Sequence, residues 1–178
     1  LRAALASLTR GSGAPGAAIA VAAGDRTVTA AIGAAAPDGR AMTAQTPVRL
    51  ASLTKTFTAA ALLRLWETGR LDLDTPISGV MAPELDRLMR DGGYDTGAIS
   101  VRHLLMHAGG LADHAESPAY LDAILAEPRH VWTRFEQVAA MVQLGSPLSA
   151  PGTAFAYSDT GYVLLGDIVE RITGQTLG

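Results

Sequence analysis

The chain has 178 residues, of which 48% are hydrophobic and 5% aromatic, and its formal net charge at pH 7 is −3. This length suits one domain or two small lobes, while the acidic balance and few aromatic residues give no support for nucleic-acid binding. The absence of cysteine excludes disulfides and thiol catalysis without fixing a compartment. No apolar run reaches the ~18 residues that a membrane span needs, so we expect no membrane-spanning segment.

The first part of the chain predicts a short helix followed by a β-hairpin. Apolar residues recur at helical spacing over residues 1–10. The glycine-rich run 11–16 formally matches Gly-x-Gly-x-x-Gly, but that dinucleotide fingerprint needs a strand before it and a helix after it. We therefore reject a nucleotide site here. Residues 17–23 and 27–32 have strand composition, and Gly24 begins a hairpin turn between them.

A long apolar run from residue 52 to residue 68 predicts a helix whose first turn carries Ser52 and Lys55. Residues three apart share a helix face, so the Ser52 hydroxyl is expected beside the Lys55 amine. A serine becomes a nucleophile when a neighbouring base takes its proton, and a desolvated lysine can be that base. The alternative is that Ser52 is an N-cap and Lys55 a solvated first-turn residue.

Lys55 is the only lysine in a chain with 14 Lys and Arg residues. Arginine does not lose its proton in proteins, whereas lysine can when it is buried. The predicted helix is apolar over most of its circumference, which is typical of a buried helix. We expect this burial to favour the neutral form of Lys55.

The rest of the chain predicts further helices, which are separated by glycine and proline. They are expected near 84–90, at 101–106 after an N-cap at Ser100, in pieces over 115–145, and over 162–172.

Two histidines of the predicted helix at 101–106, His103 and His107, are four residues apart, with Asp113 and His114 nearby. Two histidines at this spacing can share one metal ion. The glutamate of a hydrolytic zinc helix is absent, because position 104 is Leu. We therefore expect packed or hydrogen-bonded histidines, with a metal-dependent hydrolase as a distant alternative.

Five stretches in this order resemble the serine β-lactamase and penicillin-binding-protein superfamily, most closely its class C-like branch of D,D-peptidases, D-aminopeptidases and esterases. They are Ala51-Ser52-Leu53-Thr54-Lys55, residues 69–74, residues 103–111, residues 151–159 and residues 161–166. The resemblance implies an α/β (α+β) two-lobe fold, with an antiparallel sheet lobe at residues 1–50 and a nucleophile helix and helical lobe at residues 51–178. It also implies a serine hydrolase that needs no cofactor or metal.

The resemblance implies roles for three side chains. Ser52 would form an acyl-enzyme with an amide or ester, such as a D-alanyl peptide, a β-lactam or a small ester. Lys55 would help to deprotonate it, and Tyr157 would relay the proton. The backbone N–H of Ser52 would be one oxyanion-hole donor. The expected partner is thus a small-molecule or peptide substrate, and a periplasmic or secreted location is favoured over a cytoplasmic one.

Two departures from the family pattern qualify this expectation. The family usually has Asn where this chain has Asp159, a substrate-binding position. A carboxylate there would favour the Lys55 ammonium and pass the proton-taking role to Tyr157. The family's third motif and its C-terminal sheet strands are not found after Tyr157, so we expect a missing segment or a second chain to complete the sheet. The alternative function is a non-catalytic relative or fragment that binds a ligand or partner without turnover.

Overall fold

The computed structural model describes residues 1–177, which divide into two compact units. We call residues 1–50 the N-terminal unit and residues 51–177 the helical unit, and describe each by itself.

The N-terminal unit consists of helix α1 (Arg2–Ser12) and an antiparallel pair of strands, β1 (Gly16–Ala23) and β2 (Arg26–Gly33). The register runs from the Gly16–Gly33 pair at the open end to the turn at Gly24, whose φ of +57° suits a glycine. The predicted helix and hairpin are therefore confirmed. A side chain at Gly16 would meet the carbonyl oxygen of Ala34 at 2.3 Å, so the crossing backbone requires glycine there.

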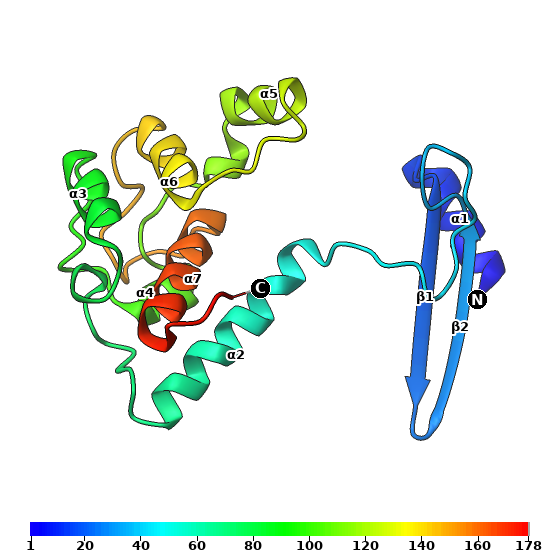
Figure 1. Cartoon of the computed structure of the whole chain (residues 1–178), viewed down its shortest axis with the longest axis horizontal. Coiled ribbons are helices and arrows are strands. Elements are labelled where there is room, and N and C mark those ends of the chain that lie inside the picture. Colours follow the sequence, from blue (N-terminus) through cyan, green and yellow to red (C-terminus); the bar gives the residue numbers. More distant parts are fainter. Residues whose placement is uncertain (178) are drawn as a thin grey trace. The chain divides into compact units, whose positions relative to one another are not determined.

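The helical unit is built around its last helix, α7, which packs against α2, α4 and α6 (Figure 1). The buried face of α7 includes Leu164, Leu165 and Ile168, all 0% exposed, which places the core of the unit along this helix. The elements are the short 3-10 turns η1 (Ala51–Leu53), η2 (Ile77–Gly79) and η3 (His114–Glu116), and the helices α2 (Thr54–Glu67), α3 (Pro83–Asp91), α4 (Val101–Leu105), α5 (Pro118–Ala126), α6 (Arg134–Gln143) and α7 (Asp159–Thr173).

Side-chain caps set the ends of several of these helices. Ser100 caps α4 as predicted, and the His103 side chain completes a reciprocal capping box with it. Helix α7 begins three residues earlier than the predicted start at Tyr162, because the Ser158 hydroxyl accepts the Gly161 N–H at 3.3 Å. The added first turn carries Asp159.

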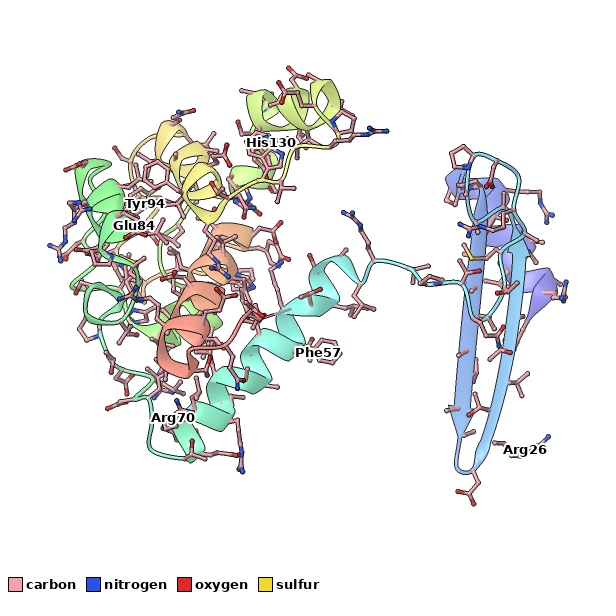
Figure 2. The ribbon with its side chains drawn as sticks, in the orientation of Figure 1. Arg26, Phe57, Arg70, Glu84, Tyr94 and His130 are labelled. Atoms are coloured by element: carbon pink, nitrogen blue, oxygen red, sulfur yellow. The ribbon has the colours of Figure 1, made fainter. Side chains whose placement is uncertain are left out.

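The prediction that α2 is buried nearly all round is wrong within the helical unit. A single stripe, formed by Thr58, Leu62 and Leu65, is buried. Phe57 is 65% exposed and projects away from α7 (Figure 2). The physical reason is that one helical neighbour, α7, covers one side of α2. Within residues 1–177, no helix combines the length and the apolar character needed to cross a bilayer.

Candidate active site

Ser52 and Lys55 meet at the start of α2, as their spacing predicts. Ser52 lies in the 3-10 turn η1 rather than in the α-helix itself, which begins at Thr54. Lys55 Nζ donates a hydrogen bond to Ser52 Oγ at 3.2 Å. Ala51, which directly precedes Ser52, has a φ of +49°, a strained backbone conformation for a residue with a side chain.

Tyr157 reaches the same serine from the segment just before α7. Its hydroxyl lies 2.9 Å from Ser52 Oγ, although the two residues are 105 positions apart in the sequence. Lys55 Nζ also lies over the Tyr157 ring, 4.9 Å from the centroid, which is a cation–π distance. The hydroxyl of Ser52 therefore touches both an amine and a phenol.

Asp159, the first residue of α7, completes the cluster. Lys55 Nζ donates to Asp159 Oδ1, and the Tyr157 hydroxyl lies 3.3 Å from the same oxygen. The carboxylate sits at a helix N-terminus, which favours negative charge. We refer to Ser52, Lys55, Tyr157 and Asp159 as the Ser52 site.

The charge on Lys55 differs from the sequence-based expectation for a buried amine. Burial lowers the pKa of Lys55, but its hydrogen bonds to Asp159 and Tyr157 and their negative charge outweigh burial, so its pKa lies above the ordinary 10.5. Burial therefore acts toward the neutral form of Lys55, as expected, but the contacts with Asp159 and Tyr157 outweigh it and keep the side chain an ammonium. The expectation that Asp159 favours the ammonium is confirmed.

The Ser52 site opens into a pocket of about 390 Å³, a size suited to a small ligand. Its walls include Thr58, His114, Gln137, Tyr162 and Val163. A larger hollow of about 650 Å³ adjoins it and shares three of these residues, Gln137, Tyr162 and Val163, but it does not include Ser52. The chemistry of Ser52 identifies the smaller pocket as the candidate site.

The histidines are held by protein hydrogen bonds, as expected, and do not converge on one point. His103 Nδ1 accepts the Ser100 N–H at 3.2 Å, and His114 Nδ1 lies 2.7 Å from Thr160 Oγ1. His107 Nδ1 accepts the Ser158 N–H at 3.1 Å. In the part of the chain that the structure describes, no group of three His, Asp or Glu side chains could hold a metal ion.

Sequence reasoning named His107 and His114 as packed or hydrogen-bonded histidines, but it did not place them, or Gln137, beside the Ser52 site. In the structure His107 stacks on Tyr157, while His114 and Gln137 line the pocket. A sequence signal existed only for the neighbourhood of His107, in the stretch 103–111 that resembles a family motif. Nothing in the spacing of Gln137 indicates that α6 carries it to the pocket wall.

Comparison with known proteins places this arrangement in a family. The family model described as Beta-lactamase matches residues 1–178. The esterase EstB of Burkholderia gladioli is 36% identical over 143 residues, which cover 78% of this chain and 36% of the esterase. The D-alanyl-D-alanine-carboxypeptidase/endopeptidase AmpH of Escherichia coli K12 is 30% identical over 166 residues, which cover 93% of this chain and 41% of AmpH.

Solved structures show the same fold. A D-stereospecific amidohydrolase from Streptomyces sp. superposes with a TM-score of 0.80 at 33% identity, over 93% of this chain and 47% of that protein. A D-amino acid amidase from Ochrobactrum anthropi gives a TM-score of 0.71 at 30% identity, over 94% of this chain and 44% of the amidase. The expected fold class is thus confirmed.

The chain spans less than half the length of each of these relatives. The family model nevertheless matches it throughout, and relatives at 30% identity or more align with over three quarters of it. The chain belongs to the β-lactamase family, whose relatives here are hydrolases of esters, D-alanyl peptides and amides.

Proposed function

We propose that this chain carries the nucleophile and the proton-transfer groups of a serine hydrolase that works through an acyl-enzyme on Ser52. The observation that supports this most directly is the double contact of Ser52 Oγ, with Lys55 Nζ at 3.2 Å and with Tyr157 OH at 2.9 Å. A nucleophile within hydrogen-bond reach of a base, which another group in turn orients, is the arrangement that nucleophilic catalysis requires.

In the proposed first step, Tyr157 as its phenolate accepts the Ser52 proton while Oγ bonds to the carbonyl carbon of the substrate. The electron pair of the carbonyl moves to its oxygen, which the Ser52 backbone N–H would help to stabilise. When this intermediate collapses, the carbon–nitrogen or carbon–oxygen bond breaks and Tyr157 returns the proton to the leaving group. Water then attacks the acyl-enzyme by the same route and releases the acid.

Lys55 serves in this scheme mainly as a fixed positive charge. Its pKa is raised because the bonds to Asp159 and Tyr157 outweigh burial, so the amine stays protonated at pH 7. The ammonium over the Tyr157 ring supports the negative charge that Tyr157 needs as a base. This assigns the proton-taking role to Tyr157 rather than to Lys55.

The substrate class we propose is an amide or ester that includes D-alanyl peptides, β-lactams and small esters. The support is the range of relatives, which includes an esterase, a D-alanyl-D-alanine-carboxypeptidase/endopeptidase and a D-amino acid amidase. The pocket beside Ser52, at about 390 Å³, suits a group of that size.

A second candidate is a non-catalytic relative that binds a ligand without turnover. The observation that favours it is the ion pair between Lys55 and Asp159, because this pair removes the neutral amine that a lysine base needs.

Intact-mass spectrometry separates the two candidates. The protein is exposed to an activated ester and to a β-lactam, with Ser52→Ala as the matched variant. We expect a mass increase equal to the acyl group in the wild type and none in Ser52→Ala. An unmodified wild type with both reagents would favour the non-catalytic candidate.

A further inference from the structure

His107 has a strained backbone that the proposed chemistry does not yet explain. Among residues 1–177, two residues other than glycine have a positive φ: Ala51 at +49° and His107 at +54°. Strained residues persist where the surrounding structure holds them, often at functional sites. Ala51 directly precedes Ser52, and His107 lies against Tyr157, so both strained residues adjoin the Ser52 site.

His107 fixes three consecutive residues around Tyr157. Its backbone oxygen accepts the Ala156 N–H at 2.8 Å, and its Nδ1 accepts the Ser158 N–H at 3.1 Å. Between these two bonds, the imidazole stacks on the Tyr157 ring, with centroids 4.4 Å apart and planes inclined by 27°. His107, with its φ of +54°, thus contacts this segment through both its backbone oxygen and its side chain.

Tyr157 depends on such support because its own segment is irregular. The residue lies outside any helix or strand, and 43% of its surface is exposed. Its hydroxyl must nevertheless remain within hydrogen-bond distance of Ser52 Oγ for proton transfer. A displacement of about 1 Å in such a group can cost on the order of 100-fold in rate.

We propose that His107 is a positioning residue for Tyr157, that it acts only while its Nδ1 is unprotonated, and that its protonation slows acylation of Ser52. This inference rests on the proposed function. A protonated imidazole donates at both nitrogens. Nδ1 would then carry a hydrogen and could no longer accept the Ser158 N–H. The segment from Ala156 to Ser158 would lose its side-chain anchor, and the Tyr157 hydroxyl would move from Ser52.

The surroundings of His107 keep the imidazole neutral at pH 7. The titratable groups that face it come from three parts of the chain. They are Lys55 on α2, Asp113 before η3, and Tyr157, Asp159 and Tyr162, of which Tyr157 precedes α7 and the other two belong to it. Burial lowers the pKa of His107 below its ordinary 6.5, and Lys55 lowers it further, while Asp159 and Asp113 act in the opposite direction with less effect.

The lowered pKa of His107 determines how stability and acylation change with pH. Because the pKa is lower in the folded protein than in the unfolded chain, the unfolded chain binds more protons below pH 6.5. Stability and acylation should therefore both fall as the pH decreases from 6.5 through the pKa of folded His107.

The test compares two amide variants that differ in where they place an acceptor. In His107→Asn, the side-chain oxygen can occupy the place of Nδ1, and asparagine tolerates a positive φ. In His107→Gln, the oxygen is one carbon further out and does not replace Nδ1. The rate of Ser52 acylation by an activated ester is followed by intact mass from pH 4.5 to 8.

We expect His107→Asn to stay within about tenfold of the wild type at pH 7.5. Below pH 6.5 its acylation rate should decline less steeply than that of the wild type, because the titration of His107 is absent while the protonation of Tyr157 remains. We expect His107→Gln to fall on the order of 100-fold. His103→Asn is the control, because His103 accepts the Ser100 N–H through the same nitrogen without contacting Tyr157's neighbour Ser158. It should keep the wild-type pH profile. Equal rates in His107→Asn and His107→Gln would overturn the proposal, as would a wild-type decline in His107→Asn.

Two resonances test the same proposal without turnover. The ¹⁵N spectrum of the imidazoles should show His107 Nδ1 unprotonated at pH 7, and the Ser158 amide signal should move in His107→Gln more than in His107→Asn. A proton on Nδ1 at pH 7, or equal shifts in both variants, contradicts the positioning role. If Ser52 is not acylated at all, the proposed function fails, while these resonances still decide the role of His107.

Discussion

The hydroxyl of Ser52 lies between Lys55 Nζ, at 3.2 Å, and Tyr157 OH, at 2.9 Å. Distance alone does not say which of the two takes its proton. Burial lowers the pKa of Lys55, but its hydrogen bonds to Asp159 and Tyr157 raise the pKa by more. The amine is therefore protonated at neutral pH and is a poor proton acceptor. For these single residues, we therefore propose Tyr157 as the base and Lys55 as the fixed charge.

Removing the Tyr157 hydroxyl tests this assignment. We expect Tyr157→Phe to lower the rate of Ser52 acylation by about 10²- to 10⁴-fold, the range that general base catalysis supplies. Tyr94→Phe is the control, because Tyr94 is a buried tyrosine whose hydroxyl contacts Gly145 rather than Ser52. A rate for Tyr157→Phe within a few fold of the wild type would return the base role to Lys55.

Replacing the carboxylate tests the charge on Lys55. We expect Asp159→Asn to alter the pH–rate profile without abolishing activity, because the pKa of Lys55 falls once its acidic partner is neutral. Because Lys55 acts as the fixed charge, the fall in rate at alkaline pH, where its ammonium loses the proton, should move to lower pH. Asp74→Asn, which disrupts an exposed ion pair with Arg102, is the control. An unchanged profile in Asp159→Asn would contradict this explanation.

The same pKa shift predicts a change of stability in alkali. A lysine whose pKa is higher in the folded protein contributes stability that is present below pH 10.5 and is lost as the pH rises through the folded value. This alkaline loss should be smaller in Asp159→Asn, as measured by urea unfolding at pH 9 and pH 11.

At the scale of elements, α7 connects the site to the core. Its first residue, Asp159, pairs with Lys55 on α2, while its middle buries Leu164, Leu165 and Ile168. Tyr162, also on α7, donates its hydroxyl to the Leu105 carbonyl at the end of α4. The packing of α7 against α2 and α4 therefore determines where Asp159 and the preceding Tyr157 lie.

Asp167 in the middle of α7 anchors the start of α3. Its Oδ2 accepts the buried N–H of Ala82, the N-cap residue of α3, at 2.7 Å. In Asp167→Ala this donor loses its partner, so we expect a loss of about 1–3 kcal/mol in the free energy of unfolding. Asp122→Ala, at an exposed position of α5, should stay within about 0.5 kcal/mol of the wild type. Urea unfolding of both variants measures the difference, and equal costs would contradict the anchoring role.

At the scale of the whole molecule, the two units differ in how much core they contain. The buried hydrophobic residues of the N-terminal unit are Leu5 and Ala30, whereas the helical unit has a continuous core along α7. A two-stranded hairpin is marginally stable in water by itself. The free energy that holds the Ser52 site together therefore comes mainly from the helical unit.

This difference predicts unequal hydrogen exchange. Backbone amides of β1 and β2 should exchange faster than those in the middle of α7, because local opening of the hairpin disrupts little buried surface. Exchange measured by mass spectrometry on proteolytic peptides resolves the two regions within one sample, and the exposed helix α5 provides an internal reference for fast exchange. Equal protection of β1 and α7 would show that the N-terminal unit gains stability from contacts beyond its own core.

The local features of this protein can be predicted from its amino-acid sequence. Helical spacing, strand composition and turn residues predicted the α1 helix, the hairpin and most later helices, because each depends on neighbours a few residues away. The approach of Lys55 to Ser52 could be predicted for the same reason, since residues three apart share a face over a single turn. The start of α7 was missed by three residues, although Ser158 and Asp159 are a cap signal.

The meeting of groups that are distant in the sequence depends on the packing of the folded chain. Tyr157 is 105 residues from Ser52, and its approach depends on the packing of α7 against α2, which no local pattern specifies. The charge on Lys55 depends on the balance between burial and the contacts with Asp159 and Tyr157, and that balance exists only in the assembled site. The stacking of His107 on Tyr157 also depends on tertiary packing, because His107 follows α4 and Tyr157 precedes α7, 50 residues later in the sequence.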